Sequence, residues 1–196
     1  MAANSGQGAV LRLTAANCVL RAWWKSDAAS LVEHANNRNV ARHLRDRFPH
    51  PYTRAHAAAF LGHVAGADIT TNFAIVVDDM AVGGIGYIRG SDVERFSAEV
   101  GYWLGEAYWG RGIMTDALTH LTRHLFEDVK LLRAFALPLA DNQGSSRVLE
   151  KAGYQREALL RASCVKYGQP RDQYLYARIN ADWSPTAKEL DPDAGP

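Results

Sequence analysis

The chain has 196 residues, a length that favours one domain whose core can form without disulfides or metals. Its 22 Lys and Arg balance 21 Asp and Glu, which argues against bulk electrostatic attraction to nucleic acid. The two cysteines, Cys18 and Cys164, lack metal-site spacing, so we expect two reduced thiols and no bound metal. The start of the chain lacks the features of a signal peptide, and no apolar run reaches membrane-spanning length. We therefore expect a cytoplasmic protein that binds neither nucleic acid nor a membrane.

The first half of the chain is predicted to alternate strands with helices. Proline restricts the residue before it and lacks an N–H donor, so the segment from Val40 to Tyr52, which contains Pro49 and Pro51, is expected to be irregular. The other predicted elements, in chain order, are a strand over 19–24, a helix from Ser26-Asp27 to Asn36-Asn37, a helix from Thr53 to Val64, and strands over 73–77 and 82–88 joined by a hairpin turn at Asp78-Asp79.

The second half is predicted to contain one long and one short helix among further strands. The long helix is amphipathic, because Met114, Ala117, Leu118, Leu121 and Leu125 recur at helical spacing. Strands are predicted over 96–104, 131–139, 154–162 and 172–179, with a turn at Gly168-Gln169-Pro170 and with Tyr174 and Tyr176 on one face. This order indicates an α/β sandwich with one mixed sheet. We expect a single domain over residues 9–181, with flexible tails at 1–8 and 184–196.

The segment from Glu99 to Leu118 contains a strand, a glycine-rich loop and the start of the long helix. A helix start leaves several backbone N–H groups without partners, and the positive end of the helix dipole lies there, so the arrangement suits a phosphate. Gly110 and Gly112 would let the backbone approach that phosphate closely, because they carry no Cβ. An ordinary strand-to-helix turn is the alternative interpretation.

A second segment has an Asn helix start, one short helix and a glycine stop. It contains Asn142-x-x-Ser145, followed by Val148-Leu149-Glu150-Lys151-Ala152-Gly153-Tyr154. Together with Tyr108-Trp109-Gly110-Arg111-Gly112, this segment resembles the acetyl-CoA-binding core of the GCN5-related N-acetyltransferases, and in particular the branch of the ribosomal-protein alanine N-acetyltransferases. The similarity extends from Asn17 to Ile179.

The resemblance implies a mixed, mostly antiparallel sheet flanked by helices, with two central strands splayed apart to form the acetyl-CoA cleft. It also implies that the backbone of 102–104 pairs with the pantetheine arm and that the glycine loop binds the pyrophosphate. A simple half-buried strand remains the alternative for 102–104. The residues expected to contact acetyl-CoA are Tyr102, Trp103, Leu104, Trp109, Gly110, Arg111, Gly112, Ile113, Met114, Thr115, Asn142 and Ser145.

Glu99, within the expected central strand, is our first candidate for the general base that removes the proton of the incoming ammonium group. A salt-bridged strand residue is an equally open interpretation. Ser145 and Tyr154 are candidates to protonate the leaving thiolate, since Leu149 occupies the position of the tyrosine that many relatives use. His50 and Tyr52 are expected to border the acceptor pocket, although structural roles remain open for both.

The resemblance therefore predicts an acetyl-CoA-dependent N-acetyltransferase whose acceptor is a primary amine, with a protein N-terminus as first choice. Two alternatives stay open: acetylation of a small amine such as a polyamine, an amino acid or an antibiotic, and a non-catalytic acyl-CoA-binding module. Both a monomer and a homodimer fit the sequence.

Overall fold

The computed structural model of the protein describes residues 13–66, 70–186 and 190. The chain divides into two units, one of residues Met1–Ile85 and Tyr102–Ile113, the other of Gly86–Gly101 and Met114–Pro196. The single domain over 9–181 stays a prediction. The expected tail at 1–8 lies outside the described residues, as do most residues of the tail at 184–196.

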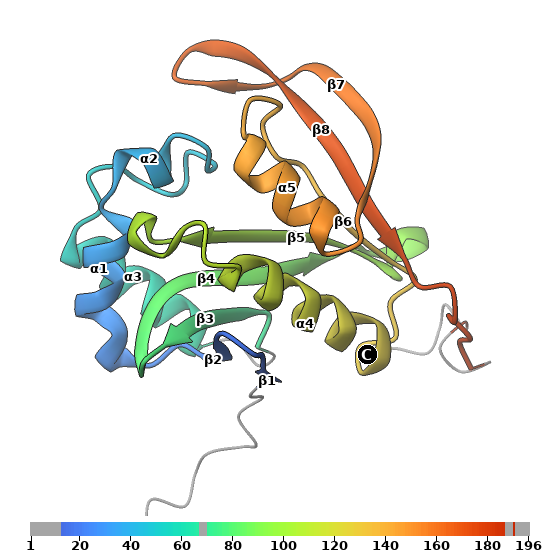
Figure 1. Cartoon of the computed structure of the whole chain (residues 1–196), viewed down its shortest axis with the longest axis horizontal. Helices are drawn as coiled ribbons and strands as arrows, with labels where there is room; N and C mark the ends of the chain where they lie inside the picture. Colours follow the sequence, from blue (N-terminus) through green and yellow to red (C-terminus); the bar gives the residue numbers. More distant parts are fainter. Residues whose placement is uncertain (1–12, 67–69, 187–189, 191–196) are drawn as a thin grey trace, which may run out of the picture. The chain divides into compact units, whose positions relative to one another are not determined.

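The first unit contains strands with helices that follow and connect them (Figure 1). Hydrogen bonding joins its strands in the order β1, β2, β3 and β4, with antiparallel pairing of β1 with β2 and of β2 with β3. Its elements are β1 (Leu13–Thr14), β2 (Val19–Ala22), the 3₁₀ helix η1 (Lys25–Asp27), α1 (Ala28–Ala35), α2 (Arg38–Ala41), α3 (Arg54–Ala65), β3 (Asn72–Val77), the first part of β4 (Met80–Arg89) and the 3₁₀ helix η3 (Glu106–Tyr108).

The core of this unit forms where the apolar faces of α1 and α3 pack with residues of β3. Leu31 of α1, Leu61 of α3 and Ala74 of β3 belong to one buried cluster. Trp23 joins the cluster and meets the Phe60 ring edge-on, with 5.4 Å between the ring centroids. The two predicted helices are confirmed as α1 and α3. At α3 the local signal acts as expected, because the Thr53 hydroxyl caps the helix by accepting a hydrogen bond from the His56 N–H at 3.3 Å.

The second unit is built around a long β7–β8 hairpin, with α5 beside it (Figure 1). Strand β5 pairs with β6 in parallel, β6 pairs antiparallel with β8, and β8 pairs antiparallel with β7. The predicted mixed, mostly antiparallel α/β fold is therefore confirmed. The elements of this unit are the end of β4, the 3₁₀ helix η2 (Asp92–Glu94), the first part of β5 (Ser97–Leu104), most of α4 (Ile113–Glu127), β6 (Arg133–Ala136), α5 (Gln143–Lys151), β7 (Gln155–Lys166) and β8 (Gln169–Ile179).

The parallel pairing of β5 with β6 is short. It joins Ser97 with Arg133 and ends where Glu99 lies opposite Phe135, whereas β5 itself continues to Leu104. Among the described residues, the two strands thus stop pairing partway along β5, as expected for central strands that separate.

One local prediction was confirmed and one was wrong. The segment predicted to be irregular contains no helix or strand over 42–52, and only Val40 and Ala41 belong to a short helix, α2, which the Asn37 side chain caps by accepting hydrogen bonds from the N–H groups of Asn39 and Val40. The last hairpin turns at Tyr167-Gly168, where both residues have positive φ, and not at Gly168-Gln169-Pro170. A two-residue turn of this kind matches the twist of the strands, so Pro170 lies within β8, opposite Val165.

Both cysteines are thiols outside any disulfide, as predicted. Cys18 is buried, with its sulfur 4.0 Å from the Ile113 carbonyl oxygen, whereas Cys164 is half-buried and lies 3.7 Å from the Arg171 carbonyl oxygen. We expect a thiol reagent to modify two groups in the denatured protein and to modify Cys164 faster than Cys18 in the folded protein, because exposure controls access. An intramolecular disulfide in the intact mass of freshly purified protein would contradict this prediction.

Candidate active site

The loop before α4 has the backbone conformation that its glycines were expected to permit. Gly110 and Gly112 have φ of +75° and +77°, a region that residues with a side chain rarely adopt. A Cβ at either position would meet no atom within 4 Å, so the space over the loop is open. Helix α4 begins at Ile113, directly after the loop. Its first N–H groups have no partner within the helix, so the loop and helix start form an anion-binding geometry.

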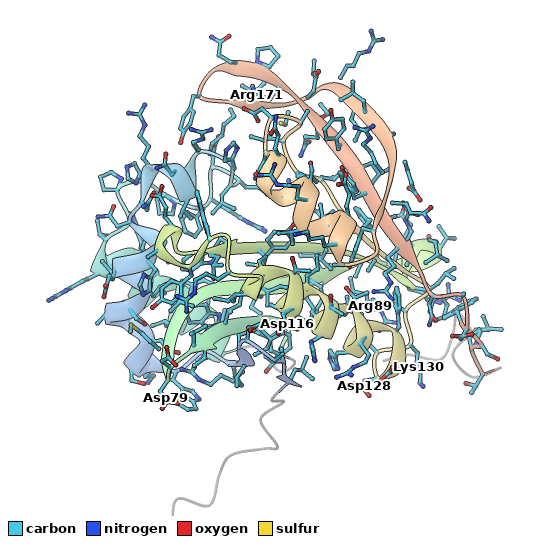
Figure 2. The ribbon with its side chains drawn as sticks, viewed as in Figure 1. Asp79, Arg89, Asp116, Asp128, Lys130 and Arg171 are labelled. Carbon is cyan, nitrogen blue, oxygen red and sulfur yellow. The ribbon has the colours of Figure 1, made fainter. Side chains whose placement is uncertain are left out.

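The first two residues of α4 are buried. Ile113 and Met114 are 2% and 7% exposed, so both side chains lie in the core and neither is placed to contact a ligand. The bulk of Met114 therefore lies away from solvent. Thr115 is half-buried. Asp116, in the same first turn, has its carboxylate 3.6 Å from the His120 Nδ1 one turn along α4 (Figure 2).

The side chains of Trp109 and Arg111 each contact a residue that precedes them in the chain. The Trp109 indole N–H donates to the Leu104 carbonyl oxygen at 2.8 Å, although the ring is 46% exposed. The exposed Arg111 guanidinium lies over the Tyr108 ring, 5.2 Å from its centroid. The loop thus presents one cation beside the two glycines.

The end of β5 fits closely against β4 because two glycines of β4 lack a Cβ. A Cβ at Gly83 would lie 2.6 Å from the Trp103 carbonyl oxygen, and one at Gly84 would lie 2.7 Å from the Trp103 indole nitrogen. Glycine within a strand permits this close approach of the two backbones. Tyr102 and Trp103 are half-buried and Leu104 is buried.

Asn142 caps α5, since its Oδ1 accepts a hydrogen bond from the Ser145 N–H at 3.1 Å. Ser145 therefore lies in the first turn of α5, where it is half-buried. Leu149 is fully buried on the same helix. The cap positions the backbone of Ser145 at the start of α5. A contact of Asn142 or Ser145 with acetyl-CoA stays a prediction.

Tyr154 lies in the core of the second unit. Its hydroxyl is 2.8 Å from the Thr122 hydroxyl, which itself donates to the Leu118 carbonyl oxygen at 2.8 Å. Burial raises the pKa of Tyr154 to about 12. These contacts favour a structural role for Tyr154, which leaves Ser145 as the candidate proton donor.

Glu99 is half-buried at the last position of the β5–β6 ladder, opposite Phe135. Its neighbours along β5, Ala98 and Val100, are buried on the opposite face of the strand. The carboxylate thus lies where β5 leaves its parallel partner.

The two residues expected at the acceptor pocket lie in different environments. Tyr52 is buried in the core of the first unit, with its ring 5.1 Å from Phe48 and 5.8 Å from His56 between centroids. Burial raises its pKa, and its backbone N–H donates to the Asn36 side chain at 3.0 Å. His50 is exposed. Of the pair, His50 is the residue whose side chain faces solvent.

Within the described part of the chain, no group of three or more His, Cys, Asp or Glu side chains is placed to hold a metal ion. None of the helices formed by these same residues is long and apolar enough to cross a membrane.

A family model described as an acetyltransferase (GNAT) domain matches residues 17–155, more than half of the chain. The protein named "Probable N-acetyltransferase YjcK" of Bacillus subtilis is 36% identical over 108 residues, which cover 54% of this chain and 58% of that protein. The ribosomal-protein-serine acetyltransferase of Escherichia coli is 33% identical over 107 residues, which cover 55% of this chain and 59% of that protein. The chain thus spans less than two thirds of these curated relatives.

A solved structure, RimJ of Mycobacterium smegmatis in complex with CoA-disulfide, is 26% identical and superposes with a TM-score of 0.75. The similarity covers 87% of this chain and 86% of that one. The resemblance indicated by the two sequence motifs is confirmed, because the family model spans both of them. This chain belongs to the GNAT acetyltransferase family.

Proposed function

We propose that this protein transfers the acetyl group of acetyl-CoA to a primary amine, with the N-terminal amine of a ribosomal protein as the acceptor. The observation that carries the proposal is the open glycine loop at the start of α4, where a Cβ at Gly110 or Gly112 would occupy the space a phosphate needs. Acetyl-CoA supplies a thioester, whose carbonyl carbon the amine attacks.

The residues of this chain have separate tasks in that proposal. The N–H groups of the loop and of Ile113, Met114 and Thr115 bind the pyrophosphate, and Arg111 adds a positive charge. The backbone of Tyr102 to Leu104 pairs with the pantetheine arm, as an added strand would. Asn142 and Ser145 contact the same arm from α5.

The proton transfers need a base and an acid. The Glu99 carboxylate accepts the proton that the ammonium group of the acceptor must lose, directly or through a water molecule. The Ser145 hydroxyl donates to the thiolate as it leaves. The acceptor nitrogen gains a bond to carbon and the carbon–sulfur bond breaks. The nitrogen then loses its second proton, which restores the Ser145 hydroxyl through a water molecule, so the products are an amide and CoA as a thiol.

The acceptor class rests on the relatives. The E. coli relative is named for acetylating a ribosomal-protein serine, and the solved structure is RimJ. An acceptor on the ribosome places the proposed activity in the cytoplasm. Acetylation of a small amine and acyl-CoA binding without catalysis are the competing functions.

Thiol release from acetyl-CoA, measured with a panel of amines, separates these functions. The panel contains peptides with N-terminal serine or alanine, polyamines, free amino acids and aminoglycosides, and CoA binding is measured alongside by calorimetry. We expect turnover with a peptide of the panel. Turnover with small amines alone would replace the proposed acceptor, and CoA binding without turnover would support a non-catalytic module.

Replacing Gly112 with valine is expected to weaken CoA binding at least about tenfold, or roughly 1.4 kcal/mol. The new side chain would enter the open space over the loop and keep phosphate away from the N–H groups. Valine at a positive φ also strains the backbone, so a matched control is needed. Gly168, in the β7–β8 turn, has φ of +74° and equally open surroundings.

Gly168→Val therefore introduces the same strain at a position far along the chain from the loop. The prediction holds if Gly112→Val loses CoA affinity and Gly168→Val keeps it, as measured by calorimetry on folded proteins. Equal affinity in both variants would remove the loop from the proposed site.

A further inference from the structure

The loop that precedes α4 is attached to α2 by a carboxylate that the sequence did not single out. Both oxygens of Glu106 accept hydrogen bonds from side-chain amides: Oε2 from Asn37 Nδ2 at 2.7 Å, and Oε1 from Asn39 Nδ2 at 2.8 Å. The Asn37 Oδ1 accepts from the N–H groups of Asn39 and Val40, at 2.7 and 3.3 Å, and so caps α2. One asparagine thus joins the start of α2 to the loop.

A ring contact attaches the same loop to α1. The His34 ring meets the Tyr108 ring edge-on, with 5.4 Å between centroids, and the Arg111 guanidinium lies over the Tyr108 ring. Gly105 lets the chain pass close to His34, because a Cβ there would lie 3.1 Å from the His34 Cβ. The buried Nε2 of His34 makes no hydrogen bond among the described residues, so this side chain acts on the loop by packing.

Backbone hydrogen bonds connect Gly105 and Glu106 to the residues that lead into the two glycines. In the 3₁₀ turn η3, the Tyr108 N–H donates to the Gly105 carbonyl oxygen at 2.9 Å, and the Trp109 N–H donates to the Glu106 carbonyl oxygen at 3.1 Å. Glu106 is therefore joined by a backbone hydrogen bond to Trp109, the residue before Gly110. Gly110 and Gly112 have more conformational freedom than other residues, so the loop needs support from outside itself to keep one shape.

We propose that Glu106 is a positioning residue for CoA: its contacts with Asn37 and Asn39, together with the packing of Tyr108 on His34, hold the glycine loop in its phosphate-binding shape before CoA arrives. A loop that is already ordered loses less conformational entropy when the ligand binds, so affinity rises without any direct contact. The inference rests on the proposed function, because it assigns the loop to the phosphates of CoA.

Two single substitutions and their combination test the hydrogen-bonded part of this support. In Glu106→Gln, one new NH₂ group faces an asparagine NH₂ group, and in Asn39→Asp two carboxylates face each other. The double variant restores complementarity, because the new glutamine NH₂ group can donate to the new aspartate while the glutamine oxygen still accepts from Asn37. We expect about tenfold weaker CoA binding in each single variant, which is a change of roughly 1.4 kcal/mol. The double variant should bind within about threefold of wild type, about 0.7 kcal/mol on the same scale.

Two further measurements separate positioning from general damage. Pantetheine lacks the phosphates of CoA, so its binding, followed by NMR titration, should be equal in the wild type and in all three variants. Glu33→Gln removes an exposed carboxylate from α1 and is the matched control for the change in charge. It should leave the affinity for CoA unchanged. Thermal unfolding without ligand checks that every variant is folded.

Three results would overturn the inference: wild-type CoA affinity in Glu106→Gln, no recovery in the double variant, or an equal loss of pantetheine binding. A wild-type protein that binds CoA beside an unaffected Glu106→Gln variant overturns this inference and leaves the proposed function standing. A wild-type protein that does not bind CoA overturns both.

Discussion

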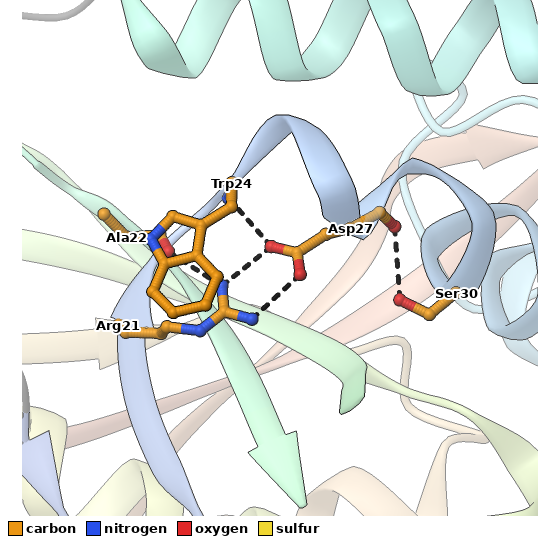
Figure 3. Close-up of polar contacts among 5 residues, drawn as sticks. All are labelled: Arg21, Ala22, Trp24, Asp27 and Ser30. Atoms are coloured by element: carbon orange, nitrogen blue, oxygen red, sulfur yellow. Dashed lines mark hydrogen bonds and ion pairs between the residues drawn. The ribbon is translucent and has the colours of Figure 1, made fainter. Parts of the chain in front are cut away.

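Replacing Asp27 with alanine is expected to lower the free energy of unfolding by about 3–5 kcal/mol, because it leaves a buried charge without its partner. Arg21 and Asp27 are only 5% and 6% exposed, and two hydrogen bonds of 2.7 and 2.8 Å join the guanidinium to the carboxylate (Figure 3). The same carboxylate accepts the Trp24 N–H at 2.8 Å, while the Trp24 ring covers the guanidinium at 3.7 Å. Asp27→Ala would remove the carboxylate that accepts from the Arg21 guanidinium and from the Trp24 N–H.

Urea unfolding followed by circular dichroism measures this loss. Arg21→Met combined with Asp27→Ala is the matched comparison, because removing both charges leaves no unpaired ion in the core, and the double variant should recover part of the stability. A loss below about 1 kcal/mol for Asp27→Ala alone would mean that the pair behaves like an exposed salt bridge.

This pair illustrates what the local pattern could and could not predict. The helix start at Ser26-Asp27 was predicted correctly, since acidic residues favour that position, and α1 begins at Ala28. The Asp27 carboxylate, however, makes no cap hydrogen bond to α1 and turns to Arg21. Position along the chain identifies a helix start, whereas the partner of a side chain depends on which strand the helix packs against.

The same division applies to the candidate site. The two positive-φ glycines and the Asn142 cap could be predicted, because each follows from a few adjacent residues. The contact of Glu106 with Asn37 could not, because the two residues are 69 positions apart and neither belongs to a recognisable motif. The burial of a side chain could not be predicted from adjacent residues either. Tyr154 is a candidate acid by sequence, but it is a core residue in the structure.

The base is the part of the site that the sequence left most open. A single glutamate in a strand fits both a catalytic role and a structural ion pair. The structure places Glu99 at the end of the β5–β6 ladder, half-buried, next to the strand residues assigned to pantetheine. We propose Glu99 as the base because of that place in the strand.

Replacing Glu99 with glutamine is therefore expected to lower turnover about 10²–10⁴-fold, the contribution usual for a general base. Glutamine keeps the shape of the side chain, so CoA affinity should stay near that of wild type. The loss should shrink as pH rises, because a larger share of the acceptor amine is then already deprotonated and needs no base. Initial rates of thiol release over a range of pH, with the acceptor found in the amine panel, measure both effects.

Ser145→Ala provides the contrasting variant, because it acts on a different proton. Its defect lies in protonation of the leaving thiolate, which a higher pH does not assist, so its loss of rate should persist across the range. Two parallel pH profiles would show that Glu99 does not remove the ammonium proton. A near-normal rate of Glu99→Gln at neutral pH would assign that step to a water molecule or to a residue between Asp46 and Tyr52, of which the exposed His50 is the first to test.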